Sequence, residues 1–511
     1  MKTNLLNLSI FNVIFFFSCV GNSVNDKGLE TKITNSNIKL SQSELIDTSI
    51  NSNETQSTHS VFHTSISEFI SGTSKSYFDS IVNVSDDFWE DFSKEINNDY
   101  SKIESIRLSK MSNWVDTSFI SKSIDTSLVF YPFSGPDFLH ANFLYPNANE
   151  YILMALEDVG SMPDWKSLGA KKTERYLENV NRFLRDIYLR SYFITKHMKL
   201  DIKEEEKISG VISSLYWFLA KTGHKIVEVN YVFIDTEGNI VLDNSSNDSK
   251  AVQFLFRKEG QSKIKKLTYI SCDISDKGFT KKNPEIKKFL TKMRECNTFV
   301  KSASYLMHYR SFNMIREIIL EKSISLFQDD TGIPYKYMKD RDLSVQCFGK
   351  YVKPIKDFEH NNDILFQKDL ELLYKKGSTK LPFSLGYHWR DANEQNQMLM
   401  TNNAKVNIIN NRIKLKIAQD SIVKFRLDSI FKVETTNDKY IVVGSFKKLF
   451  RANMLLKKLK GKGYKSVNVI THDNKHLVVF GPYNSRNIDK ELNTIKLKLE
   501  ENAWVFILPK S

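Results

Sequence analysis

The sequence YIVVGSF, at Tyr440–Phe446, is followed by LVVFGPY at Leu477–Tyr483, and this pair of similar segments decides the fold of the C-terminal part of the chain. Each segment is a run of β-branched and aromatic residues interrupted by a glycine, Gly444 or Gly481. Such residues favour strands, and glycine permits the turn that ends a strand. The two segments therefore predict two strands of one compact domain.

The residues around these two strands complete a β-α-β-β-α-β order. Apolar residues recur at helical spacing in Leu449–Lys462 and again in Ser485–Glu500. Tyr464–Ile470 alternates as a strand does, and Ala503–Leu508 supplies the last strand. This order folds as a four-stranded antiparallel sheet of the RNP or ferredoxin-like kind. Both helices then cover one face, and the other face is open to a ligand.

This C-terminal segment, Asp438–Ser511, resembles a SPOR domain, the sporulation-related repeat. The resemblance rests on the GSF and GPY motifs and on five spaced residues and a closing pair: Ala452, Leu455, Leu459, Gly463, Tyr464 and Ala503-Trp504. It implies binding to peptidoglycan, typically to glycan strands stripped of their stem peptides at division sites. It implies no enzymatic activity and no cofactor.

The resemblance also places the ligand site on the open face of the sheet. Many SPOR domains have a polar residue before the first glycine and an arginine or aromatic residue at the start of the third strand. Here these positions hold Val442 or Val443 and Leu477. Nearby polar and aromatic side chains can bond or stack with sugars. The predicted peptidoglycan-binding residues are Tyr440, Val442, Ser445, Lys475, His476, Leu477 and Tyr483. The alternative makes Tyr440 and Tyr483 half-buried strand residues.

Residues 1–19 have the pattern of a signal peptide. Lys2 precedes an apolar run, Leu8–Phe17, that is too short and too interrupted to span a membrane. Ser18 before Cys19 resembles the cleavage site of bacterial lipoproteins, which predicts lipidation of Cys19 and a periplasmic protein anchored to the outer rather than the inner membrane. Phe16 departs from the aliphatic residue usual at its position, so simple secretion is the alternative.

Two linking segments flank the central region. Residues 20–64 are rich in Ser, Asn and Thr, a composition that cannot offset ordering entropy, so we predict a disordered tether. Residues 405–437 are basic and aliphatic, and they predict a β-rich connector with strands at Arg412–Ile417 and Ile422–Leu427. An amphipathic segment on a membrane surface is the alternative for this connector.

Residues 65–404 predict one large α+β domain of unknown activity. Strands are expected before Pro132 and at Tyr151–Leu156, and helices at Arg175–His197, Ile208–Thr222 and Phe299–Glu321. The region has no internal repeat, which argues against a solenoid.

The segment FSGPD contains Ser134, which could act as a nucleophile with Asp137, His140 or Glu157 nearby in sequence. It lacks the glycine two residues before the serine that a nucleophile elbow uses. The simpler interpretation is a tight Pro/Gly turn in which Asp137 accepts backbone hydrogen bonds. We therefore predict no catalytic residue. A peptidoglycan-targeted hydrolase, or another envelope enzyme with its active site in the central domain, is the alternative function.

The simpler interpretation of the formal net charge of +13 is solvated helix and loop faces, and the alternative is a set of anionic partners. In a secreted chain these are envelope polymers and lipid headgroups rather than nucleic acid. The C-terminal topology also resembles an RNA-recognition module, but the aromatic signature of such modules is missing and a signal peptide is present.

Cysteine and histidine positions exclude several other classes. After Cys19, the irregularly spaced Cys272, Cys296 and Cys347 exclude a scaffold with several disulfides and show no paired metal-ligand pattern. No H-E-x-x-H motif occurs, and we predict no metal and no cofactor. The sequence thus predicts a cell-envelope protein that binds peptidoglycan glycan strands and localises its central domain to the cell wall or division site, alongside envelope or division proteins.

Overall fold

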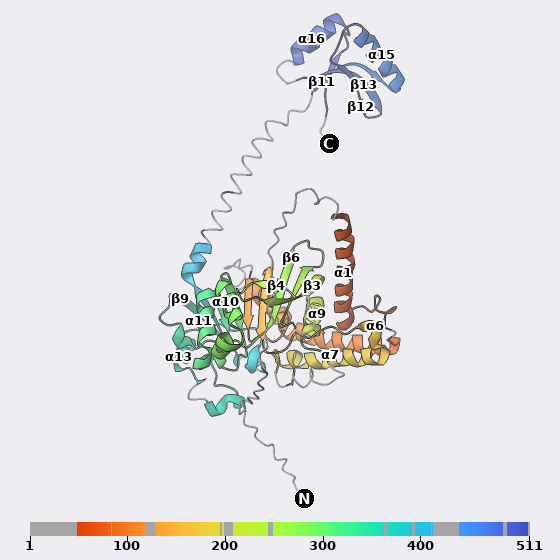
Figure 1. Ribbon diagram of the computed structural model, residues 1–511. Coiled ribbons are helices and arrows are strands. Elements are labelled where there is room, and N and C mark those ends of the chain that lie inside the picture. The colour runs from red at the N-terminus through yellow and green to blue at the C-terminus, as the bar shows by residue number, and fades with distance from the viewer. Residues whose placement is uncertain are drawn as a thin grey trace, which may run out of the picture. The chain divides into compact units, whose positions relative to one another are not determined.

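The computed structural model describes residues 49–82, 84–117, 128–194, 197–198, 208–243, 249–361, 365–390, 394–409, 411, 419, 439–483 and 488–508. These residues form a central domain and a C-terminal domain, which we describe separately (Figure 1). The predicted signal peptide, Cys19 and most of the connector lie outside the described residues. Mixed α and β content with a small C-terminal sheet confirms the predicted fold class.

A ten-stranded sheet organises the central domain, in the order β4-β3-β5-β6-β2-β1-β7-β8-β10-β9. The five strands in the middle of the sheet, β6-β2-β1-β7-β8, are parallel to one another. The strands on both sides of them pair antiparallel. The strands are β1 (Leu128–Pro132), β2 (Glu150–Ala155), β3 (His224–Ile234), β4 (Ile240–Leu242), β5 (Ala251–Lys258), β6 (Ile264–Ser271), β7 (Cys296–Val300), β8 (Ser323–Gln328), β9 (Leu343–Gly349) and β10 (Asn396–Asn402).

The parallel strands change direction of growth at β1. The chain moves from β1 to β2 and β6 on one side, and then returns to add β7 and β8 on the other side. This is the order of a doubly wound sheet, and the boundary between β1 and β7 is its topological switch point. Ligands of such sheets bind outside the carboxyl ends of the strands at that boundary.

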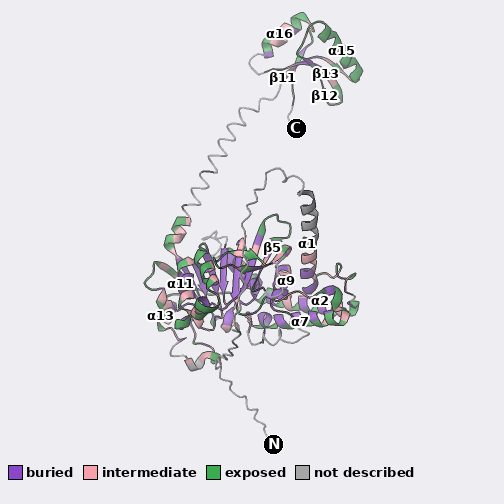
Figure 2. Cartoon of the chain, in the orientation of Figure 1, coloured by how far each residue is buried: buried purple, intermediate pink, exposed green. Residues whose placement is uncertain are grey.

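Helices cover both faces of this sheet, and strands such as β1 are therefore buried along their whole length. Val129 and Tyr131 face one apolar core, and Phe130 faces the other. Figure 2 shows the buried residues concentrated in the sheet and the helix surfaces against it. Helices on the first core are α1 (Ser49–Ile70), α2 (Asp86–Ile103), α3 (Ser109–Thr117), α5 (Phe138–Leu144), α6 (Trp165–Leu168), α7 (Ala170–Arg190) and α9 (Ile212–Lys221). Those on the second are α10 (Pro284–Lys292), α11 (Asn313–Lys322) and α13 (Lys368–Lys376).

Helix α1 corrects the predicted tether, because residues 49–64 are helical rather than disordered. Thr64 Oγ1 donates to the carbonyl oxygen of Ile226 at 3.1 Å and accepts from the amide of the same residue at 3.0 Å. Ser60 Oγ donates to that carbonyl as well, at 3.1 Å. Small hydroxyl side chains thus fasten the helix to β3, a tertiary contact that composition alone cannot reveal.

Two other segments differ from the prediction. Phe299–Glu321 is not one helix, because β7 ends at Val300 and α11 begins only at Asn313. At the start of the predicted β-rich connector, residues 403–409 are helical. The two strands predicted farther along the connector lie outside the described residues.

The C-terminal domain has the predicted β-α-β-β-α-β order. Its antiparallel sheet runs β12-β13-β11-β14, and α15 and α16 pack with it around one apolar core. The elements are β11 (Lys439–Phe446), α15 (Leu449–Gly461), β12 (Val467–His472), β13 (Lys475–Tyr483), α16 (Ile488–Lys498) and β14 (Trp504–Ile507). This core is built from the domain's own residues, which include Ile441, Ala452 and Val478.

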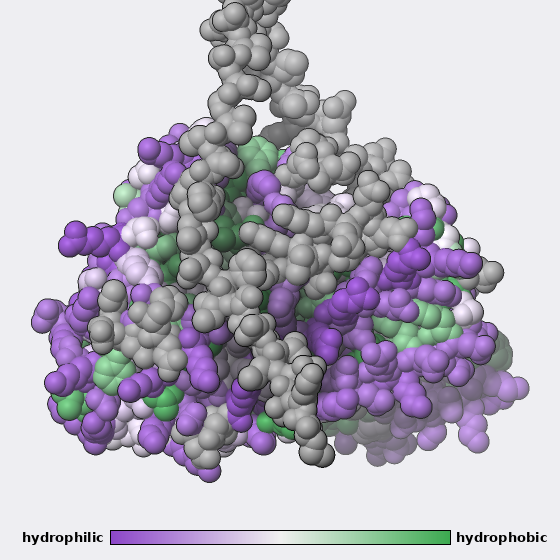
Figure 3. All heavy atoms as spheres, turned by 90° about the horizontal axis from the view of Figure 1, so that it is seen from below, coloured by the Kyte–Doolittle hydropathy of each residue, from purple (hydrophilic) through white to green (hydrophobic). Residues whose placement is uncertain are grey.

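Within the described part of the chain, no helix is long and apolar enough to cross a bilayer. Hydrophilic side chains make up most of the described surface on the side that Figure 3 draws.

Candidate functional sites

The C-terminal sheet has a second apolar cluster on the face away from its helices. Val442, Leu477 and Val479 are its buried members, with 1%, 4% and 0% of their surface exposed. Tyr440, Ile470 and Phe506 pack against them and are partly buried. Because strand residues alternate between faces, this cluster is distinct from the helix-covered core that contains Ile441 and Val478. We call these six residues the sheet-face cluster.

Aromatic side chains stand around the sheet-face cluster. The rings of His472 and Phe506 come from the two outer strands and lie with their centroids 4.9 Å apart. Trp504 pairs with Val442 across β14 and β11, contacts Phe506, and keeps 46% of its surface exposed. The sheet is therefore curled, with the sheet-face cluster on its concave side, and Trp504 has an exposed ring beside this cluster. Such a ring can stack on the apolar face of a sugar.

The predicted binding residues divide between the two faces of the sheet. Val442 and Leu477 are buried members of the sheet-face cluster, and Tyr440 packs against them. Ser445 pairs with Leu477 and is exposed, and Lys475 is exposed at the β12–β13 turn.

Two of the predicted residues lie toward the helices. Tyr483 packs with the helix-covered core, and burial raises the pKa of its phenol. His476 alternates with Leu477 along β13, and its Nδ1 lies 3.0 Å from Thr471 Oγ1.

The prediction missed Trp504, Phe506 and His472. The alternation in WVFI at Trp504–Ile507, paired antiparallel with β11, is the signal that places the first two on the open face.

Residues 436–506 match the family model of the SPOR domain. The C-terminal domain is a SPOR domain. SPOR domains bind peptidoglycan, so this part of the chain marks a protein of the cell envelope. No curated protein and no solved structure matches the chain significantly.

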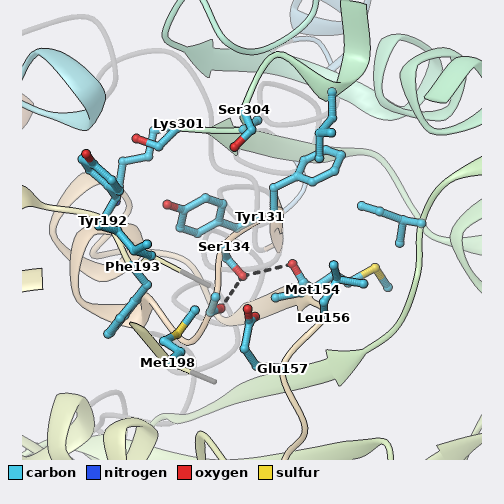
Figure 4. Close-up of a pocket in the computed structure, with 18 of the residues that line it drawn as sticks. Tyr131, Ser134, Met154, Leu156, Glu157, Tyr192, Phe193, Met198, Lys301 and Ser304 are labelled. Carbon is cyan, nitrogen blue, oxygen red and sulfur yellow. Dashed lines mark hydrogen bonds between the residues drawn. The ribbon is translucent and has the colours of Figure 1, made fainter. Parts of the chain in front are cut away.

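Outside the SPOR domain, the central domain contains a cavity of about 370 Å³. It lies where four parallel strands end, and is lined by residues directly after β1, β2, β6 and β7. Figure 4 shows Tyr131, Ser134, Glu157 and Lys301 around it. This is the switch-point position at which doubly wound sheets bind small molecules, and the volume is in the range of ligand pockets. This cavity could not be predicted from the sequence, because its lining comes from segments far apart in the chain.

A buried charge cluster lies behind this cavity and is centred on Asp137. Its carboxylate accepts from Tyr131 Oη at 3.2 Å, from His140 Nδ1 at 2.9 Å and from Lys301 Nζ at 2.7 Å. Burial alone would raise the pKa of Asp137, but the attraction of His140 and Lys301 outweighs it and lowers that pKa. Burial lowers the pKa of His140 to about 4, so the imidazole is neutral at pH 7. Burial also lowers the pKa of Lys301, but the attraction of Asp137 and the hydrogen bond to it act in the opposite direction. With His140 neutral, we assign Asp137 and Lys301 as the charged pair.

The geometry favours the turn interpretation of FSGPD. Asp137 accepts from the backbone amide of His140 at 3.2 Å and is the N-cap residue of helix α5. Ser134 Oγ donates to the carbonyl oxygens of Gly135 at 2.6 Å and Met154 at 3.4 Å (Figure 4). In a serine triad the histidine binds the aspartate through Nδ1 and the serine through Nε2. His140 Nδ1 does bind Asp137, but its Nε2 has no hydrogen-bond partner among the described residues, and Ser134 Oγ bonds backbone carbonyls instead, so Ser134 and His140 are not paired as a nucleophile and its base.

A second buried pair, Asp329 and Asp330, follows β8. Asp329 Oδ2 accepts from the amide of Ser302 at 2.8 Å, and Asp330 Oδ2 accepts from Tyr305 Oη at 2.5 Å. Burial, with a further contribution from Asp329, raises the pKa of Asp330 to about 7. Among the described residues, no group of His, Cys, Asp and Glu is arranged to hold a metal ion, and Cys272, Cys296 and Cys347 are free thiols.

Proposed function

We propose that this protein binds the glycan strands of peptidoglycan through the open face of its SPOR domain and holds its central domain at the cell wall or division site. The family match over residues 436–506 carries the proposal. The face of the sheet opposite helices α15 and α16 also supports it. That face carries the exposed ring of Trp504, and sugar ligands stack on such rings.

The proposed contact surface consists of the sheet-face cluster and the exposed side chains around it. Trp504 supplies a stacking surface, while Ser445 and Lys475 supply hydrogen-bond donors. Val442 and Leu477 are buried in the sheet-face cluster, so their part is to shape the surface rather than to bond a sugar. This cluster replaces polar side chains expected of the family, and we infer a site that relies on stacking more than on hydrogen bonds.

We further propose that Cys19 carries a lipid and anchors the chain to the outer membrane. The apolar run before Cys19 and the small residue next to it support this assignment. Lipidation would place the protein on a membrane surface that faces peptidoglycan, with other envelope or division proteins as neighbours. Mass spectrometry of the protein from its host tests this, because a chain cleaved before Cys19 and carrying no acyl groups would contradict it.

Co-sedimentation with purified peptidoglycan tests the binding proposal. Residues 436–511 can be used alone, because this domain has its own core. We expect saturable binding, and a Trp504→Ala variant that binds roughly threefold to tenfold more weakly through the loss of stacking. Leu497→Ala is the matched control, because Leu497 is 87% exposed on helix α16 and lies away from the open face. Equal binding by Trp504→Ala and the wild-type domain would contradict the proposed surface.

An envelope enzyme is the alternative function, and the cavity of the central domain favours it. A catalytic assignment needs a nucleophile or an acid and base that face that cavity. Ser134 faces it but has its hydroxyl bonded to backbone carbonyls. Ser134 is therefore not assigned as a nucleophile, and we assign no catalytic residue to the central domain.

A further inference from the structure

The cavity at the switch point has a lining that selects among ligand chemistries. Its carboxylates are Glu157, Asp273 and Asp357, and Lys301 is the one cation among the described lining residues. Lys301 Nζ is already bound to Asp137, at 2.7 Å, and to the carbonyl oxygen of Ser191. Asp273 is itself paired with Lys282 Nζ at 2.9 Å, so the charge of the carboxylates is partly compensated from outside the lining. Because the one cation of the described lining is already bound, that lining offers an anionic ligand no free counter-charge.

The first turn after β1 is closed to phosphate. In dinucleotide-binding sheets, the pyrophosphate lies on the amide groups at the start of the helix that follows the first strand. Here that helix, α5, has only seven residues, and the carboxylate of Asp137 accepts from its first turn. Gly135, with φ of +56°, is also packed against Phe193, because an added Cβ would lie 3.3 Å from Cδ2 of that ring. An anionic phosphate would meet a carboxylate instead of free amides.

Glu157 occupies the position at which such sheets bind hydroxyl groups. In dinucleotide-binding sheets an acidic residue about 20 residues beyond the glycine turn, after the second strand, accepts from a ribose hydroxyl. Glu157 follows β2 in the same way, is only 5% exposed, and directs its carboxylate into the cavity (Figure 4). Tyr269 Oη donates to its backbone carbonyl at 2.8 Å, which holds this turn in place.

Other lining groups suit a ring with polar substituents. Ser302 Oγ is buried and has no hydrogen-bond partner within the described residues. A ligand hydroxyl or amide can supply that partner. Tyr192 and Tyr387 contact each other with centroids 4.8 Å apart and, with Phe193, give the cavity an aromatic side. Flat apolar rings of this kind pack against purines and against the apolar faces of sugars.

We propose that this cavity binds a phosphate-free ring with vicinal hydroxyl groups, which Glu157 accepts as hydrogen-bond donors. Nucleosides and peptidoglycan amino sugars share this chemistry. The inference is independent of the SPOR domain, because it rests on the central domain alone.

Isothermal titration of the purified full chain tests the proposal, with adenosine and N-acetylglucosamine as probes. AMP and N-acetylglucosamine 1-phosphate are the matched phosphate-bearing compounds. We expect one neutral probe to bind, and its phosphate derivative to bind at least tenfold more weakly. Binding of adenosine identifies a nucleoside site, and binding of N-acetylglucosamine identifies a sugar site. Absence of binding by both neutral probes, or equal binding of a phosphate derivative, would overturn the proposal.

Variants locate the ligand within the protein. Glu157→Gln keeps the shape of the side chain but removes its charge, and we expect at least tenfold weaker binding. Leu156→Trp adds bulk at the cavity opening, where Leu156 is 59% exposed, and we expect weaker binding without loss of fold. Glu259→Gln, at an exposed turn away from the lining, is the control and should bind as the wild type does. Unchanged binding by both cavity variants would overturn the assignment.

Discussion

Substituting Lys301 with methionine should destabilise the central domain by several kcal/mol. The Lys301 and Asp137 side chains are 1% and 0% exposed, and their charged atoms are 2.7 Å apart. Methionine keeps most of the volume of lysine but leaves the Asp137 carboxylate buried beside a neutral His140. Removal of one partner from a buried ion pair costs about 3–5 kcal/mol, because the other charge remains without compensation. That is a large share of the roughly 5–15 kcal/mol that stabilises a folded domain.

Lys250 provides the matched control for this substitution. Lys250 Nζ and Asp158 Oδ1 are also 2.7 Å apart, but both side chains are 68% exposed. An exposed pair of this kind contributes about 0–1 kcal/mol, so Lys250→Met should be nearly silent. The two pairs thus differ in burial and not in distance.

Urea unfolding followed by tryptophan fluorescence measures both variants, and Asp137→Asn with the double variant completes a thermodynamic cycle. We expect the double variant to lose less stability than the sum of its parts, because it leaves no buried charge without a partner. A cost below about 1 kcal/mol for Lys301→Met, or additive single effects, would refute this account of the buried pair.

Two further predictions concern pH, and both use urea unfolding of a variant beside the wild type. Burial, with smaller contributions from Lys265 and Lys258, lowers the pKa of His224 from 6.5 to about 3. The stability that neutral His224 supplies is complete above pH 6.5 and is lost as pH falls, by up to about 1.4 kcal/mol per pH unit. His224→Gln should therefore show a shallower loss from pH 6.5 to 4, and equal slopes would contradict this. Asp330 has the opposite effect, and its raised pKa, about 7, makes the stability of the protein fall as pH rises. The reason is that the native state retains a proton that the unfolded state releases above pH 3.8. The stability of Asp330→Asn relative to wild type should rise from pH 4 to 7 and then level off, and a flat difference would show that Asp330 is ionised in the fold.

The C-terminal domain could be predicted from sequence because its information is local. Each strand is a short β-branched run, and the apolar periodicity of Leu449–Lys462 and Ser485–Glu500 marks the helices between them. Sequential elements pair in space here, as β12 and β13 do through the Asp473-Asn474 turn, in which both residues have positive φ. The curl that buries Val442 and Leu477 was not predictable, because it depends on how the outer strands approach each other.

The central domain was predicted in its parts but not in its assembly. The strands at Leu128–Pro132 and Glu150–Ala155 were recognisable from their sequence alone. The parallel order was not, since the described elements α6, α7, α9, β3, β4 and β5 lie between β2 and β6 in the chain. The predicted helix Phe299–Glu321 includes Phe299 and Val300, the last two residues of strand β7 (Cys296–Val300), because a short apolar run fits either structure. Without that order, Glu157, Ser302 and Asp273 have no reason to be neighbours.

The central claim is that the SPOR domain binds glycan strands, and a comparison of two peptidoglycan preparations tests it most directly. Residues 436–511 are incubated with purified peptidoglycan before and after an amidase removes the stem peptides, and the bound fraction is measured. The account predicts saturable retention that increases on the denuded glycan. No retention on either preparation would contradict it, and retention that falls after amidase treatment would show that the domain binds the peptides instead.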